Sequence, residues 1–233
     1  MVGHPKHVSK ALEVGVDLIC AQAGEGGGHT GDMPASILIP AVVDEVKGKK
    51  SPLTGGPVLV VGAGAVYDGR GLAANLAWGA QAVWVGTRFV ACEEAGAPPT
   101  HKKAIVDAGH DDFARTLIYT GRPLRVIRNP YVDDWYVGKT PFSGKCIDAD
   151  PDSRENNRQA EAKALLQQGI LPVEKDLKEH PEKSLASRPW LTGRVAAQIH
   201  EVLPAKKIID DMVNEAATIL RHNGSMVNSK AKL

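Results

Sequence analysis

The sequence has few cysteines and no long apolar run, and both scarcities narrow what the chain can be. Its 233 residues include three cysteines, Cys20, Cys92 and Cys146, which lie too far apart for a disulfide framework or a metal-binding motif. No apolar run approaches the roughly 20 residues that a membrane-spanning helix needs. The first residues also lack the apolar segment of a secretory signal. We therefore expect reduced thiols, no metal site, no membrane partner and a cytoplasmic location.

Aromatic residues are scarce too, and neither sign of charge is in excess. Aromatic side chains make up 5% of the residues, and there are 28 basic side chains against 27 acidic ones. A chain this close to neutral lacks the basic surface that attracts nucleic acids or anionic membranes. Apolar residues reach 43%, which is enough for a core. The composition therefore favours a globular protein without a nucleic-acid partner.

Glycine, by contrast, is concentrated in one stretch. Residues 21–32 read AQAGEGGGHTGD; an apolar segment precedes them and a patterned helix candidate follows. A glycine-rich loop between a strand and a helix lets backbone N–H groups approach a ligand with no side chain in the way. Nothing around His29 supplies bulk for packing, so we predict that this histidine is functional. The alternative is a solvated loop with an incidental histidine.

The first 90 residues alternate between apolar runs and helical patterns. The order strand–helix–strand–helix–strand with short turns predicts parallel strands with right-handed crossovers. Residues 1–3 resemble the end of one more strand, and Asp68 is a plausible helix N-cap. The predicted strands are 16–21, 57–61 and 82–85, and the predicted helices are 5–13, 34–47 and 68–79. The inward positions predicted for the last two helices are Ile37, Leu38, Ala41, Val42 and Val46, then Leu72, Leu76 and Ala77.

Each of the three predicted strands ends in a loop that contains glycine. In parallel α/β folds, ligands bind at the rim formed by the carboxyl ends of the strands. The small residues of Gly64-Ala65 and Gly86-Thr87 leave N–H groups free to hold a phosphate. Tight packing explains any one such loop equally well, but three loops at the same rim favour a ligand site.

Beyond residue 92 the pattern weakens. We predict helices at 100–108 and 154–168, a short strand at 116–119 and little regular structure over 121–157. Arg122, Arg125 and Arg128 are expected in a solvated basic loop, and residues 174–187 are charged and loosely patterned. The last strong helix is 205–222, closed by Asn223-Gly224. Its predicted core-facing stripe is Ile208, Ile209, Met212, Val213, Ala216, Ile219 and Leu220.

Three segments, taken in order, resemble the nitronate monooxygenase (2-nitropropane dioxygenase) family of FMN-dependent enzymes. They are residues 21–31, with EGGGHTG where the family has EAGGHxG, residues 67–74 (YDGRGLAA) and residues 83–89 (VWVGTRF). This ordered set is specific to the superfamily, which also includes flavin-dependent enoyl reductases. The VW pair and residues 93–97 are more similar to fungal-type nitronate monooxygenases, so nitronate oxidation ranks first.

The resemblance implies an α/β fold built as a partial TIM (β/α)8 barrel, with strands 6–8 and their helices, plus a C-terminal helical region. Residues 1–115 would form the C-terminal part of the FMN-binding barrel. Residues 116–203 would form an inserted lid or substrate region, and residues 204–233 a C-terminal helix and tail. An incomplete barrel leaves sheet edges open. The resemblance therefore also implies a truncated chain or fragment that self-associates through those edges.

The same resemblance implies FMN as cofactor, with a small nitro compound and O2 as partners. His29 would take the α-proton of a neutral nitroalkane, a role that suits imidazole because histidines commonly titrate near neutral pH. The alternatives are an enoyl reductase that uses a nicotinamide as hydride donor and a non-catalytic fragment that binds no flavin tightly. The phosphate would lie on the N–H groups of Gly64, Ala65, Gly86 and Thr87, and the flavin ring would be bordered by Gln22 and Gly28. The family usually has two glycines where Gly64-Ala65 stand.

Overall fold

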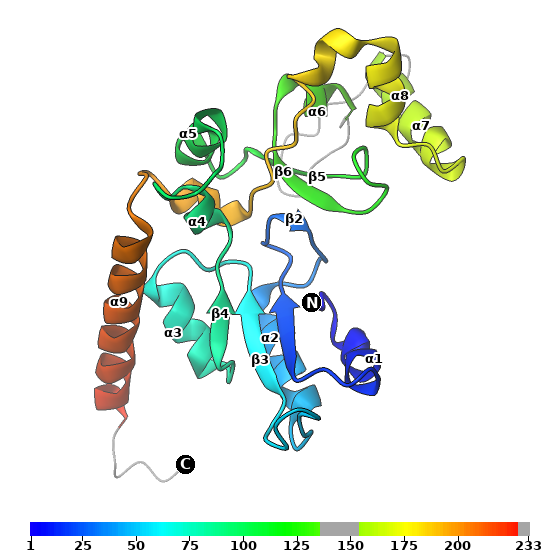
Figure 1. The fold of residues 1–233 in the computed structure, drawn as a ribbon. Coiled ribbons are helices and arrows are strands. Elements are labelled where there is room, and N and C mark those ends of the chain that lie inside the picture. The colour runs from blue at the N-terminus through cyan, green and yellow to red at the C-terminus, as the bar shows by residue number, and fades with distance from the viewer. Residues whose placement is uncertain (136–153, 228–233) are drawn as a thin grey trace.

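The computed structural model describes residues 1–135 and 154–227, which form an α/β protein with two small sheets (Figure 1). The predicted α/β class is confirmed. Predictions that concern residues 136–153 and 228–233, including Cys146, lie outside the described residues. Among the helices of the described ranges, none is long and apolar enough to cross a membrane.

The first sheet is parallel, as predicted. Its strands β1 (Leu18–Gln22), β3 (Leu59–Ala63) and β4 (Ala82–Trp84) lie in the order β1-β3-β4. The first two begin two residues later than expected. Val2 adds a parallel bridge beside β1, where its N–H donates to the Cys20 carbonyl at 2.8 Å. Residues 1–3, predicted to resemble the end of a strand, therefore make one isolated bridge and do not form a strand of their own.

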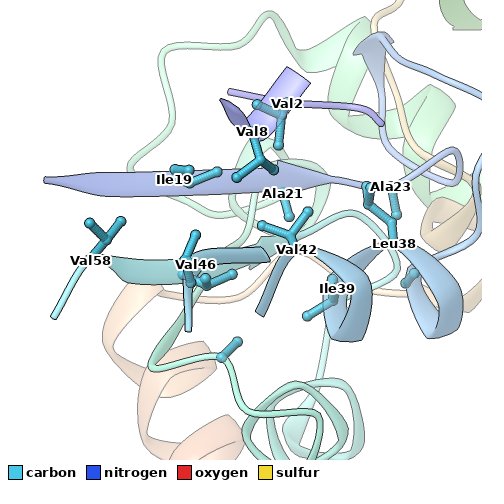
Figure 2. Close-up of a cluster of buried hydrophobic side chains, with 13 residues drawn as sticks. Val2, Val8, Ile19, Ala21, Ala23, Leu38, Ile39, Val42, Val46 and Val58 are labelled. Atoms are coloured by element: carbon cyan, nitrogen blue, oxygen red, sulfur yellow. The ribbon is translucent and has the colours of Figure 1, made fainter. Parts of the chain in front are cut away.

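Helix α2 (Ala35–Val46) covers one face of this sheet and builds the main core (Figure 2). It follows the short turn η1 (Pro5–His7) and helix α1 (Val8–Glu13) along the chain, with β1 in between. Its buried side chains recur at helical spacing and share one core with residues of β1 and β3; they are Ala35, Leu38, Ile39, Val42 and Val46. Ile37, which the same pattern predicted to face inward, is 57% exposed instead.

Helix α3 (Gly69–Ala77) begins where the sequence predicts. The Asp68 carboxylate caps it by accepting from the Gly71 N–H at 3.2 Å. The prediction that Leu76 and Ala77 face inward is wrong, because both are exposed. Ala73 and Asn75 are buried in their place, and the Asn75 side chain lies against Gly62 of β3.

The close approach of α3 to β3 requires glycine at position 62. A Cβ added at Gly62 would lie 1.8 Å from the Asn75 Oδ1 atom, and the Asn75 side chain is held by a bond from its Nδ2 to the Gly71 carbonyl. We expect Gly62→Ala to lower the free energy of unfolding by about 1–3 kcal/mol, measured by urea denaturation. Gly96→Ala is the control, since a Cβ there meets nothing within 4 Å. Equal stability of the two variants would contradict the packing argument.

The second sheet is antiparallel and connects segments far apart in the sequence. It contains β2 (Gly28–His29), β6 (Leu124–Ile127) and β5 (Phe113–Thr116) in the order β2-β6-β5. The strand predicted at 116–119 is wrong, because β5 ends at Thr116. Little regular structure over 121–157 is also wrong, since β6 and α6 (Pro130–Trp135) occupy part of it. All four β6 residues are buried, so the sequence lacks the alternation of polar and apolar residues by which a half-exposed strand is predicted.

The remaining helices connect and flank the two sheets. The predicted helices near 100–108 and 154–168 are found, whereas α8 in the charged segment was not predicted. In Figure 1 the α6–α8 group lies at the far side of the second sheet from the first. The connecting and flanking helices are α4 (Thr87–Val90), α5 (Pro99–Asp107), α7 (Arg154–Gln167), α8 (Pro172–Glu179), η2 (Pro181–Ser184) and η3 (Arg194–Gln198).

Helix α9 (Ala205–Met226) lies alongside α3 (Figure 1). It runs through Gly224, so the predicted end at 223–224 is wrong. Only Ile208, Met212 and Ala216 of the predicted stripe are buried, while Ile209 and Val213 are about half exposed. The helices touch closely, because a Cβ added at Gly69 would lie 2.5 Å from the Ala216 nitrogen. This narrow contact explains why half of the stripe stays outside the core.

Candidate functional site

The loops that follow β1, β3 and β4 meet at one cavity of about 200 Å³. All six residues predicted to hold the cofactor line it, namely Gln22, Gly28, Gly64, Ala65, Gly86 and Thr87. Trp84 also lines it, with its side chain 61% exposed. The loops come together because the strands are parallel and neighbouring, so their carboxyl ends share one rim.

The backbone of this cavity is suited to an anionic group. In the described part of the chain, the N–H groups of Gly64, Ala65 and Gly86 donate to no protein acceptor. A Cβ added at Gly86 or Gly28 would meet nothing within 4 Å, so open space lies beside both glycines. Glu25, the charged side chain of the lining, turns away and accepts from the Ala35 N–H at the start of α2, at 3.2 Å from each oxygen. Free N–H groups of successive residues are the usual donors of phosphate sites that lack a cation.

Ala65 adopts a left-handed backbone conformation, with φ of 58°. This region costs a residue with a Cβ about 1–2 kcal/mol, while glycine loses about 0.4–1 kcal/mol through its freer unfolded chain. We expect Ala65→Gly to raise the free energy of unfolding by up to about 1 kcal/mol and to preserve ligand binding. Ala74→Gly in helix α3 is the control and should lower stability by about 1 kcal/mol. A large loss of stability in Ala65→Gly would contradict the claim that the backbone conformation of Ala65 is strained.

Side chains from both sheets hold the glycine loop. The Gln22 Nε2 atom donates to the carbonyls of Gly27 and His29, at 3.2 and 2.8 Å. Arg125, on β6, is 7% exposed and donates to the carbonyls of Gly24 and Gly26, at 2.7 and 3.2 Å. The prediction of a solvated loop is therefore wrong for Arg125, although it holds for the exposed Arg122 and Arg128.

A second support that the sequence did not reveal is the segment 191–195. Leu191, Gly193 and Val195 line the small cavity, and the Gly193 N–H donates to the Thr87 hydroxyl at 2.9 Å. A Cβ added at Gly27 would lie 2.6 Å from the Gly193 nitrogen, so the two backbones are in close contact. No periodic pattern marks this segment, because its contacts with the loops of the small cavity are made by the Gly193 backbone with residues more than 100 positions away.

Arg88, which is buried, and His101, which is partly buried, contact this segment and the chain that follows it. The Arg88 Nη1 atom donates to the Glu201 carbonyl at 2.8 Å, and burial lowers the pKa of this guanidinium. Burial also lowers the pKa of His101, whose ring lies 5.0 Å from that of Trp190 and whose Nε2 is 3.4 Å from the Thr192 hydroxyl. Both groups are held by the fold and lie outside the lining of the small cavity.

His29 lies at the adjoining larger cavity, of about 1050 Å³. Gln22 and Gly27 line both cavities, so the cavity that His29 lines is adjacent to the cavity of the free N–H groups. Lys6 and Arg122 add positive charge to the lining, while Asp32 is paired with Arg115. The His29 Nε2 atom lies 2.9 Å from the Thr120 hydroxyl oxygen. Within the described residues, no three His, Cys, Asp or Glu side chains cluster as a metal site would require.

The chain is similar to known proteins over most of its length. The sequence model of the nitronate monooxygenase family matches residues 1–215. A Mycobacterium tuberculosis dehydrogenase, named for an indene carboxyl-CoA compound, is 30% identical over an alignment of 243 positions, covering 97% of this chain and 66% of that protein.

Two solved structures superpose on most of the chain. FabK from Thermotoga maritima does so with a TM-score of 0.72 at 26% identity, covering 97% of this chain and 62% of that one. A nitroalkane oxidase from Streptomyces ansochromogenes gives a TM-score of 0.63 at 26% identity, with 95% and 57% covered. The chain thus spans less than two thirds of the length of each of these relatives.

Proposed function

Because the chain belongs to the nitronate monooxygenase family, we propose that it takes part in the FMN-dependent oxidation of alkyl nitronates and nitroalkanes by O2. The observation that carries this proposal is the convergence of three strand-end loops on one cavity that adjoins His29. The nitroalkane oxidase named above, at 26% identity, supports the same substrate class.

The residues of the small cavity fit the phosphate and ring of a flavin. The N–H groups of Gly64, Ala65, Gly86 and Thr87 would hold the phosphate, and Gln22 and Gly28 would border the ring. When bound, FMN supplies the electron acceptor that links oxidation of the substrate to O2. The chain's own backbone positions the group, since the glycines admit it without a side chain in the way.

His29 acts on the proton of a neutral substrate. His29 lines the larger cavity, so a nitroalkane bound there would have this imidazole as its neighbouring base. Removal of that proton yields the nitronate, and a substrate that is already ionised needs no base. His29 is therefore required for oxidation of the neutral nitroalkane and not for oxidation of its nitronate.

In architecture, the parallel strands and helices of residues 1–115 would be strands 6–8 of a (β/α)8 barrel. Residues 116–203 would form the substrate region and residues 204–233 the C-terminal helix and tail. The open edges at Val2 and β4 would pair with further strands or with a second copy of the chain. The cytoplasm is the location we propose for this enzyme.

A second candidate is a flavin-dependent reductase of the same superfamily. The Mycobacterium tuberculosis dehydrogenase, which is similar over 97% of this chain, favours it. Anaerobic mixing of the FMN-loaded protein with NADH separates the two functions. Slow or absent bleaching of the flavin supports nitronate oxidation, whereas rapid bleaching supports the reductase.

Flavin binding itself is tested by titrating FMN into the purified protein and recording its visible absorbance and fluorescence. We expect a yellow protein that retains FMN through gel filtration. Gly86→Val, which places a side chain in the open space of the cavity, should lose FMN, while the matched variant Gly96→Val should retain it. A colourless wild-type protein would overturn the proposal and support a non-catalytic fragment.

A further inference from the structure

Thr120 is the residue that the structure places against the His29 ring. The two are 91 positions apart, and Thr120 lies in the turn between β5 and β6. β2 brings them together, because Gly28 and His29 pair with Arg125 and Leu124 of β6. The Thr30 N–H donates to the Pro123 carbonyl at 3.4 Å and continues this pairing. The contact therefore rests on the backbone pairing of two strands.

The hydroxyl of Thr120 has three neighbours but only one proton. Its oxygen lies 2.9 Å from His29 Nε2 and 3.2 Å from the Arg122 carbonyl, and the Arg122 N–H approaches it at 3.4 Å. The Arg122 carbonyl can only accept, so the hydroxyl proton goes to it. The oxygen then offers its lone pairs to the Arg122 N–H and to the ring. All three contacts are satisfied only when His29 Nε2 carries the hydrogen.

We infer that Thr120 is a positioning residue that holds neutral His29 as the Nε2–H tautomer and leaves Nδ1 as its basic nitrogen. This inference rests on the proposed role of His29 as a base. Within the described residues, no other group bonds the ring, so Nδ1 keeps its lone pair for the substrate. The turn between β5 and β6 thus sets the orientation of the imidazole that β2 carries at the cavity.

The tautomer is observed directly in two-bond ¹H–¹⁵N spectra of histidine-labelled protein at alkaline pH, with the His29→Asn variant assigning the signal. We expect the Nε2–H form in the wild type and in Thr120→Ser, which keeps the hydroxyl. Thr120→Val should shift the ring toward the tautomer mixture of a solvent-exposed histidine side chain. Thr218→Val is the matched control, since that hydroxyl bonds the Asn214 carbonyl within α9. An Nδ1–H ring in the wild type, or an unchanged ring in Thr120→Val, overturns the inference.

Kinetics separates this inference from the proposed function. Thr120→Val should lower kcat/KM for a neutral nitroalkane about 10-fold and leave turnover of the pre-formed nitronate unchanged, with Thr120→Ser restoring the loss. Full activity of Thr120→Val alongside an inactive His29→Asn overturns the positioning role alone. Full nitroalkane activity of His29→Asn overturns the proposed base, whatever the spectra of Thr120 variants show.

Discussion

Replacing His29 with asparagine is expected to lower kcat/KM for a neutral nitroalkane by about 100-fold or more, because a positioned general base contributes about 10²–10⁴-fold. The same variant should oxidise the pre-formed nitronate at nearly the wild-type rate, since that substrate has already lost its proton. FMN should remain bound, because the small cavity is lined by Gly28 and its neighbours and not by the His29 ring. Steady-state oxygen consumption with both forms of one substrate measures the difference.

The control for this experiment is His222→Asn on the exposed end of α9, which should keep full activity with both substrate forms. A His29→Asn enzyme that loses both activities equally would show that the residue positions the substrate. An enzyme that retains both would remove His29 from the mechanism. The ratio of the two rates is therefore the informative quantity.

Replacing Arg125 with leucine is expected to lower the free energy of unfolding by about 3–5 kcal/mol. Hydrogen bonds to a charged donor contribute about 1.5–3 kcal/mol each, and the variant leaves two buried carbonyls, of Gly24 and Gly26, without their donor. We expect FMN affinity to fall as well, because these carbonyls belong to the loop that borders the cavity. Urea denaturation and FMN titration measure the two effects.

Arg128→Leu provides the matched control. Arg128 lies one residue beyond β6 and pairs with Asp133 at 2.8 Å, with both side chains about 40% exposed. Such a surface pair contributes about 0–1 kcal/mol. A similar loss in the two variants would mean that the general charge of the segment, and not the bonds of Arg125 to the loop, stabilises the fold.

Local chemistry explains which elements the sequence predicted well. Helix α2 is recognisable because its buried residues recur every three to four positions, and α3 because Asp68 caps it. The parallel strands are short apolar runs bounded by glycine. Each of these signals depends only on neighbouring residues, so it can be recognised without knowing which element packs against the helix or strand. The same locality explains the errors at Leu76 and Val213, where burial depends on how closely α9 approaches α3.

The amino-acid order alone determined the α/β class, the family and the three glycine loops with His29, because each of these features depends on short stretches of consecutive residues. Only the tertiary structure decided that Arg125, Gly193 and Thr120 support those loops. Each acts across about 90 residues or more: Arg125 through two backbone carbonyls, Gly193 through the Thr87 hydroxyl and Thr120 through one atom of the His29 ring. Such contacts impose no repeating pattern on the chain. They become visible only when β6 pairs with β2 and brings the second sheet against the first.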